Sequence, residues 1–83
     1  IMSSKKRATI LEVDDEAGIR QSFNMILKDD YNILIASSGS EALDRFKSHA
    51  VDLVLLDILL PDTGGLDLLE KFKEADPTVE VIM

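Results

Sequence analysis

Three aspartates have the side-chain type and the positions needed to gather a metal cation. Asp14 and Asp15 directly follow the short apolar segment 8–13, and Asp57 interrupts the most apolar segment of the chain, residues 51–60. If these segments form neighbouring strands of a parallel sheet, the three carboxylates converge at one edge of it. Carboxylates held that close raise one another's pKa and cost stability unless a cation is present. A hard divalent ion such as Mg²⁺ takes a few carboxylates together with water and phosphate oxygens.

Each aspartate also has a purely structural interpretation. Asp14 and Asp15 could act as the N-terminal anions of a following helix, and for these two alone this is about as plausible as a metal site. Asp57 is harder to explain in this way, because an ionisable group between Leu56 and Ile58 rarely goes unpaired and this stretch has no basic residue. The three aspartates together are therefore a more specific sign of a metal site than the pair Asp14 and Asp15 alone or Asp57 alone.

The hydrophobic pattern around these residues predicts alternating strands and helices. Four strands and three helices, each crossover being long enough for a helix, indicate an α/β fold with a doubly wound parallel sheet and helices on both faces. The near-continuous apolar run 51–60 indicates a strand buried on both faces. Ser38 and Glu41 match the capping-box pattern at a helix start. The predicted strands are 8–13, 31–36, 51–60 and 79–83, and the predicted helices span about 16–29, 38–49 and 66–76, the last one after a turn over residues 61–65.

Composition limits the class of protein and its partners. The chain of 83 residues fits one small domain, preceded by a basic tail over residues 1–7, and its net charge of −7 disfavours direct nucleic-acid binding. There is no cysteine, which excludes disulfides, thiolate metal sites and cysteine nucleophiles. Charges interrupt every apolar stretch and no signal peptide is visible, so we expect no membrane span and a cytoplasmic location.

From Ala8 to Met83 the sequence resembles the receiver domain of two-component response regulators. The motifs that carry the resemblance are ILEVDDE at 10–16, VDLVLLDILLP at 51–61 and Gly65-Leu66. The resemblance implies a flavodoxin-like sheet whose strands, as far as they are present here, take the order 2-1-3-4.

The resemblance also implies a role for each acidic residue. It makes Asp57 the phosphoacceptor, to which a sensor histidine kinase passes a phosphoryl group in a Mg²⁺-dependent reaction. It makes Asp14 and Asp15 the acidic pair that holds Mg²⁺ together with Asp57, and the backbone carbonyl of Leu59 the remaining protein ligand. Such a domain is a phosphoacceptor rather than an enzyme, although it would catalyse its own phosphorylation and dephosphorylation.

Two features depart from the family's pattern. Glu12 stands inside a predicted central strand where the family usually has an apolar residue, either because this strand is less covered than usual or as a functional substitution. The sequence also ends at Met83, before the hydroxyl residue of the fourth strand and the lysine of the fifth. We therefore expect residues 8–83 to form the N-terminal two thirds of the domain. We further expect a homo-oligomer, formed through the edge of strand 79–83 or through an uncovered sheet face.

Two alternatives to the phosphoacceptor hypothesis stay open. One is a self-associating interaction fragment that binds a cation but takes part in no efficient phosphotransfer. The other is a phosphatase-like hydrolase with an aspartyl nucleophile. It is the weaker of the two, because such enzymes need a second aspartate two residues after the first, where Leu59 stands. His49 does not support the hydrolase hypothesis, because we expect His49 to be a surface residue at the end of a helix.

Overall fold

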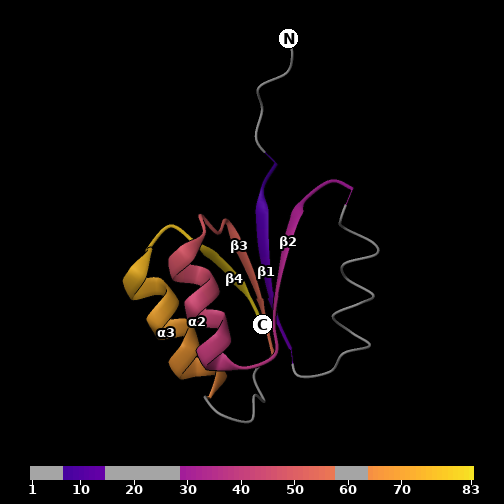
Figure 1. Ribbon diagram of the computed structural model, residues 1–83. Coiled ribbons are helices and arrows are strands. Elements are labelled where there is room, and N and C mark those ends of the chain that lie inside the picture. Colours follow the sequence, from indigo (N-terminus) through magenta and orange to yellow (C-terminus); the bar gives the residue numbers. More distant parts are fainter. Residues whose placement is uncertain (1–6, 15–28, 58–63) are drawn as a thin grey trace.

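A computed structural model describes residues 7–14, 29–57 and 64–83, which form a four-stranded parallel sheet and two helices (Figure 1). The strand order is β2-β1-β3-β4, as predicted. The predicted helix near 16–29 and residues 1–6 of the basic tail lie outside the described residues. The elements are β1 (Thr9–Val13), β2 (Asn32–Ala36), α2 (Gly39–Ser48), β3 (Leu53–Leu56), α3 (Gly65–Ala75) and β4 (Glu80–Ile82).

β1 occupies the interior of the sheet and is its most buried strand. On one side it pairs along its whole length with β2, and on the other side its residues 10–13 pair with β3. Residues 10–13 are all buried, whereas β2 and β4 at the two ends of the strand order are only partly covered. The residues that end β1 are therefore fixed by hydrogen bonds from both neighbouring strands.

The hydrophobic core lies between the sheet and the two helices, which cover the same face (Figure 1). The rings of Phe46 in α2 and Phe72 in α3 meet with centroids 4.8 Å apart, so the helices also pack on each other. Both helices carry the predicted apolar stripe on this side. The buried cluster consists of Leu11, Val13, Ala36, Ala42, Phe46, Val51, Val54, Leu56, Leu68, Phe72 and Val79.

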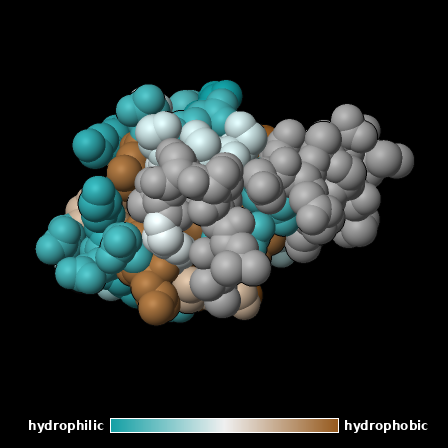
Figure 2. Space-filling view, turned by 90° about the horizontal axis from the view of Figure 1, so that it is seen from below, coloured by the Kyte–Doolittle hydropathy of each residue, from teal (hydrophilic) through white to brown (hydrophobic). Residues whose placement is uncertain are grey.

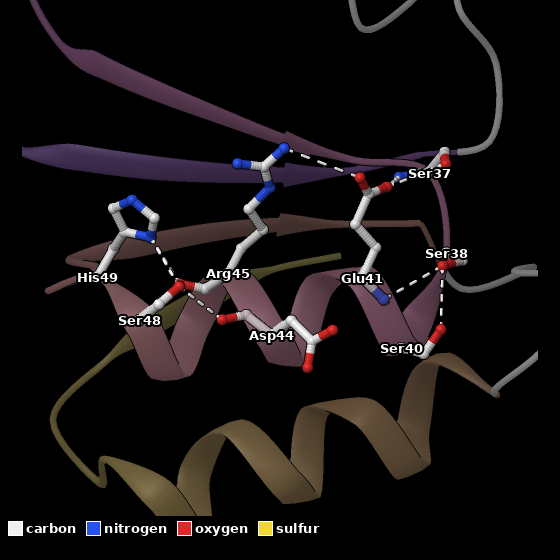
Figure 3. Close-up of polar contacts among 8 residues, drawn as sticks. All are labelled: Ser37, Ser38, Ser40, Glu41, Asp44, Arg45, Ser48 and His49. Atoms are coloured by element: carbon white, nitrogen blue, oxygen red, sulfur yellow. Dashed lines mark hydrogen bonds and ion pairs between the residues drawn. The ribbon is translucent and has the colours of Figure 1, made fainter.

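The start of α2 has the predicted capping arrangement (Figure 3). Ser38 is the N-cap residue, and its hydroxyl accepts a hydrogen bond from the Glu41 backbone N–H at 3.2 Å. The Glu41 carboxylate reaches back to the Ser37 backbone N–H at 2.7 Å, one residue beyond the N-cap amide that a capping box normally uses. These contacts fix the turn between β2 and α2 at the edge of the sheet where β1 also ends.

Polar contacts hold the turn from α3 to β4, which begins at the predicted end of the helix, Asp76. The carboxylate of Asp76 accepts hydrogen bonds from the backbone N–H of Thr78 at 3.0 Å and from its hydroxyl at 2.6 Å. These two bonds favour the ionised form, so they hold the pKa of Asp76 below its usual value. The ammonium group of Lys73 donates to the carbonyl of Val79 across the same turn.

Burial differs from the sequence prediction in two strands. The run 51–60 predicts a strand covered on both faces, but Leu53 and Leu55 of β3 are only half-buried. β1 is the strand covered on both faces, and Glu12 within it is 2% exposed. The suggestion that Glu12 is tolerated in a poorly covered strand is therefore wrong.

Candidate functional site

Asp14 and Asp57 leave the sheet side by side at the carboxyl ends of β1 and β3. Val13 pairs with Leu56 in the parallel register, and the two aspartates are the next residues on their strands. The backbone N–H of Asp57 donates to the carbonyl of Val13 at 2.9 Å, and that of Asp14 donates to the carbonyl of Ala36 at 3.1 Å. The ladder thus continues into both aspartates, and adjacent parallel strands are about 4.8 Å apart.

The alternation of side chains places both aspartates on the same face of the sheet. Leu11 and Val13 belong to the core cluster beneath the helices, so Glu12 and, by continuation, Asp14 lie on the opposite face. Leu55 pairs with Glu12, and Asp57 follows it by two residues on that face. Both aspartates are half-buried. Partly covered carboxylates at neighbouring strand ends suit a hard cation, which prefers oxygen ligands.

The other two predicted ligands, Asp15 and Leu59, lie outside the described residues. Within the ranges 7–14, 29–57 and 64–83, no group of three or more histidine, aspartate and glutamate side chains is arranged to hold a metal ion. Of the four predicted cation ligands, the described residues include two, Asp14 and Asp57.

The other aspartate of the apolar run has a structural function. The side chain of Asp52 accepts a hydrogen bond from the backbone N–H of Thr9 at 2.8 Å, and its own N–H donates to the carbonyl of Thr9 at 2.9 Å. Asp52 thus ties the beginning of β3 to the beginning of β1, at the opposite end of the strands from Asp57.

His49 is an exposed residue at the end of α2, as predicted. Its ring Nδ1 lies 3.1 Å from both the Arg45 carbonyl oxygen and the Ser48 hydroxyl (Figure 3). It completes the helix end, where a group that can carry positive charge is favoured. His49 is therefore not placed to act on Asp57 as an acid or base.

The sequence predicts Glu12 inside a central strand, which is confirmed, but the shared face of Glu12 and the two aspartates was not predicted. Glu12 lies on the same face as Asp14 and Asp57, one step further into the sheet. The period of two along β1 carries this signal, because Glu12 and Asp14 are two residues apart.

Figure 2 views the molecule from the end at which these strands finish. On the side of the two helices its described surface is mainly hydrophilic, with a few hydrophobic side chains between the polar ones. Among the described residues, no helix has the length and apolar character needed to cross a membrane.

Known proteins are similar to this chain in sequence or in structure. Sporulation initiation phosphotransferase F of Bacillus subtilis is 39% identical over 75 residues, which make up 89% of this chain and 60% of that protein. A CheY-like receiver domain protein of Methanospirillum hungatei superposes with a TM-score of 0.91 at 37% identity, over 94% of this chain and 63% of that one. The response regulator TrrA of Thermotoga maritima, solved in complex with Mg²⁺ and BeF, superposes with a TM-score of 0.85 at 36% identity. The match covers 92% of this chain and 67% of that one.

The chain spans less than two thirds of the phosphotransferase and of the Methanospirillum protein. The sequence profile of the response regulator receiver domain matches residues 10–83, which include residues 10–13 of β1, the two aspartates at the strand ends and the last strand. The chain belongs to the response regulator receiver domain family.

Proposed function

We propose that the chain is a phosphoacceptor domain in which Asp57 receives a phosphoryl group from the phosphohistidine of a sensor histidine kinase. The observation that carries this proposal is the adjacency of Asp14 and Asp57 at the carboxyl ends of two neighbouring strands. This edge of an open parallel sheet is where ligands bind in doubly wound folds. Family membership supports the same function.

In the proposed reaction, a carboxylate oxygen of Asp57 attacks the phosphorus atom. The new oxygen–phosphorus bond forms as the phosphorus–nitrogen bond of the phosphohistidine breaks, and the departing imidazole takes up a proton. The product is an acyl phosphate on Asp57, and water later hydrolyses it. The hydrogen bond from the Asp57 N–H to Val13 fixes the backbone of the nucleophile, which favours a reaction that depends on positioning.

We propose Mg²⁺ as the cofactor of this reaction, because both described carboxylates offer the hard oxygen ligands that it prefers. Asp14, Asp15 and Asp57 would hold the ion with the backbone carbonyl of Leu59. When bound, Mg²⁺ supplies positive charge that offsets the repulsion between the attacking carboxylate and the phosphoryl group. The relative TrrA was solved in complex with Mg²⁺ and BeF, which supports this choice.

Phosphorylation by acetyl phosphate with Mg²⁺, followed by intact-mass spectrometry, tests the proposal. The wild-type chain should gain the mass of one phosphoryl group, and Asp57→Asn should gain none, because its amide is not a nucleophile. Asp44→Asn is the matched control, since Asp44 is an exposed aspartate on α2, and it should react like the wild type. Equal labelling of Asp57→Asn and the wild type would overturn the proposal.

A wild-type chain that binds Mg²⁺ but gains no phosphoryl group would instead support the alternative function, a self-associating module with a cation site. The exposed side chains of Ile82, the last residue of β4, and of Met83 after it are the observation that favours this alternative.

A further inference from the structure

The peptide group between Ala36 and Ser37 joins the start of α2 to the end of β1. The carbonyl oxygen of Ala36 accepts a hydrogen bond from the Asp14 backbone N–H at 3.1 Å. The N–H of Ser37, in the same peptide group, donates to the Glu41 carboxylate at 2.7 Å. Because a peptide group is a rigid plane, a contact on its N–H also fixes its carbonyl oxygen. Glu41 is thus connected to the backbone of Asp14 through one rigid unit.

The Glu41 carboxylate is held against this peptide group by further contacts (Figure 3). Its Oε1 atom, which accepts the Ser37 backbone N–H, also accepts the Ser37 hydroxyl at 3.1 Å. Its Oε2 atom lies 3.8 Å from Nη2 of Arg45, one helical turn further along α2. Since both side chains of this ion pair are partly exposed, it orients the carboxylate rather than adding much stability.

The bond from Asp14 to Ala36 lies at the end of the ladder between β1 and β2. The last residues paired in the register are Val13 and Ala36, and the bond from the Asp14 N–H comes directly after them. Backbone bonds at the end of an element open more readily than those in its interior. Hydrogen bonds in a chain polarise one another, and a carboxylate is a strong acceptor, so the bond to Glu41 strengthens the Ala36 carbonyl as the acceptor for Asp14.

We propose that Glu41 is a positioning residue for Asp14. Through the Ala36–Ser37 peptide group, it fixes the backbone of Asp14 where the Asp14 carboxylate binds a divalent cation. This inference rests on the proposed function, because it concerns the same site. Glu41 is not a ligand itself, since α2 covers the face of the sheet opposite to the one on which Asp14 lies.

Amide hydrogen exchange of the metal-free chain, measured residue by residue by NMR, tests the connection. Glu41→Ala should speed the exchange of the Asp14 N–H at least about fivefold, because the acceptor of that N–H is less firmly held. The exchange of the Asp57 N–H should change by less than about twofold, since it donates to Val13 on the other side of the sheet.

Ser38→Ala is the matched control, because it separates this role from helix capping. The Ser38 hydroxyl caps the Glu41 backbone N–H, so its loss weakens the start of α2 but leaves the contact between the Glu41 carboxylate and Ser37 in place. The exchange of the Asp14 N–H in Ser38→Ala should stay within about twofold of the wild type.

Titration calorimetry with Mg²⁺ gives the second readout. Glu41→Ala should raise the Kd for Mg²⁺ about tenfold, as expected when a residue that supports a metal ligand is lost. Ser38→Ala and Arg45→Gln should bind with a Kd within about twofold of the wild type. Glu41→Gln should lie between the wild type and Glu41→Ala, because its amide oxygen can accept the Ser37 N–H but is a weaker acceptor than a carboxylate.

The role of Glu41 and the proposed function fail differently in these experiments. If the wild type binds Mg²⁺ and Glu41→Ala binds it within about twofold, the role of Glu41 is wrong and the proposed function stands. Unchanged exchange of the Asp14 N–H in Glu41→Ala, or an equal effect of Ser38→Ala, would also overturn the role of Glu41. If the wild type binds no Mg²⁺, the cation site is wrong, and the role of Glu41 is wrong with it.

Discussion

Asp52 and Asp57 stand at opposite ends of β3, and their surroundings assign them different roles. Asp52 accepts a hydrogen bond from the Thr9 backbone and joins the beginnings of two strands. Asp57 follows the last pair of the β1–β3 ladder beside Asp14. Two aspartates five residues apart in one apolar run thus serve the fold and the proposed chemistry separately.

The positions of Asp14 and Asp57 could be predicted from the sequence, because each comes at the end of an apolar strand segment and parallel strands end at one edge. The burial of Glu12 could not be predicted in the same way. It depends on how completely β1 is covered from both faces, which is a property of the tertiary structure rather than of the local pattern.

Asp76 provides a pH-dependent test at the residue scale. The hydrogen bonds from Thr78 lower the pKa of Asp76 in the folded state, so its carboxylate stabilises the fold when ionised. This contribution is fully present above the unfolded-state value of about 3.9 and is lost as pH falls through the lowered folded-state pKa. Asp76→Asn should therefore be less stable than the wild type at neutral pH, and the difference should shrink below about pH 4. Urea unfolding across this range measures it, and a difference independent of pH would contradict the assignment.

At the scale of elements, the strand and helix pattern was predictable because each segment has a clear hydrophobic period and recognisable ends. Ser38 marks the start of α2, and Asp76-Pro77 marks the end of α3. The exact limits of the strands were harder to predict from the sequence. The apolar run 51–60 gives only Leu53–Leu56 as described strand, since apolar character does not show where the ladder of hydrogen bonds begins and stops.

Because Phe72 joins α3 to α2, we expect the free energy of unfolding to depend strongly on its side chain. Its side chain is fully buried, at 0% exposed, and its ring packs on Phe46. Phe72→Ala should lower the free energy of unfolding by about 3–5 kcal/mol, and Phe72→Leu by less, because a smaller cavity remains. Leu66→Ala, on the same helix at a site 68% exposed, should change it by no more than about 0.5 kcal/mol. Urea unfolding of the three variants tests this, and equal losses for Phe72→Ala and Leu66→Ala would contradict the packing described.

At the scale of the whole molecule, the sheet ends in a strand that presents apolar side chains. β4 is the last strand in the order β2-β1-β3-β4, and Ile82 and Met83 are 56% and 45% exposed. Exposed edge strands of this kind pair readily with another chain. We therefore propose that the chain self-associates through β4. The net charge of −7 on each chain opposes this association by electrostatic repulsion.

Sedimentation at micromolar concentration tests this proposal. The wild type should sediment as a dimer or larger species, and Ile82→Lys should shift it toward the monomer, since a lysine on an edge strand disfavours pairing. Leu66→Lys, which places the same charge at an exposed apolar position on α3, should leave the association unchanged. A compact wild-type monomer, or an equal effect of both substitutions, would contradict association through β4.

The most direct test of the central claim is ¹⁹F NMR of beryllofluoride, a mimic of the phosphoryl group, with and without Mg²⁺. The account predicts bound fluorine signals that require Mg²⁺, that disappear in Asp57→Asn and that weaken in Asp14→Asn, because both carboxylates serve one site. Bound signals that persist in Asp57→Asn, or that form in the wild type without Mg²⁺, would contradict it.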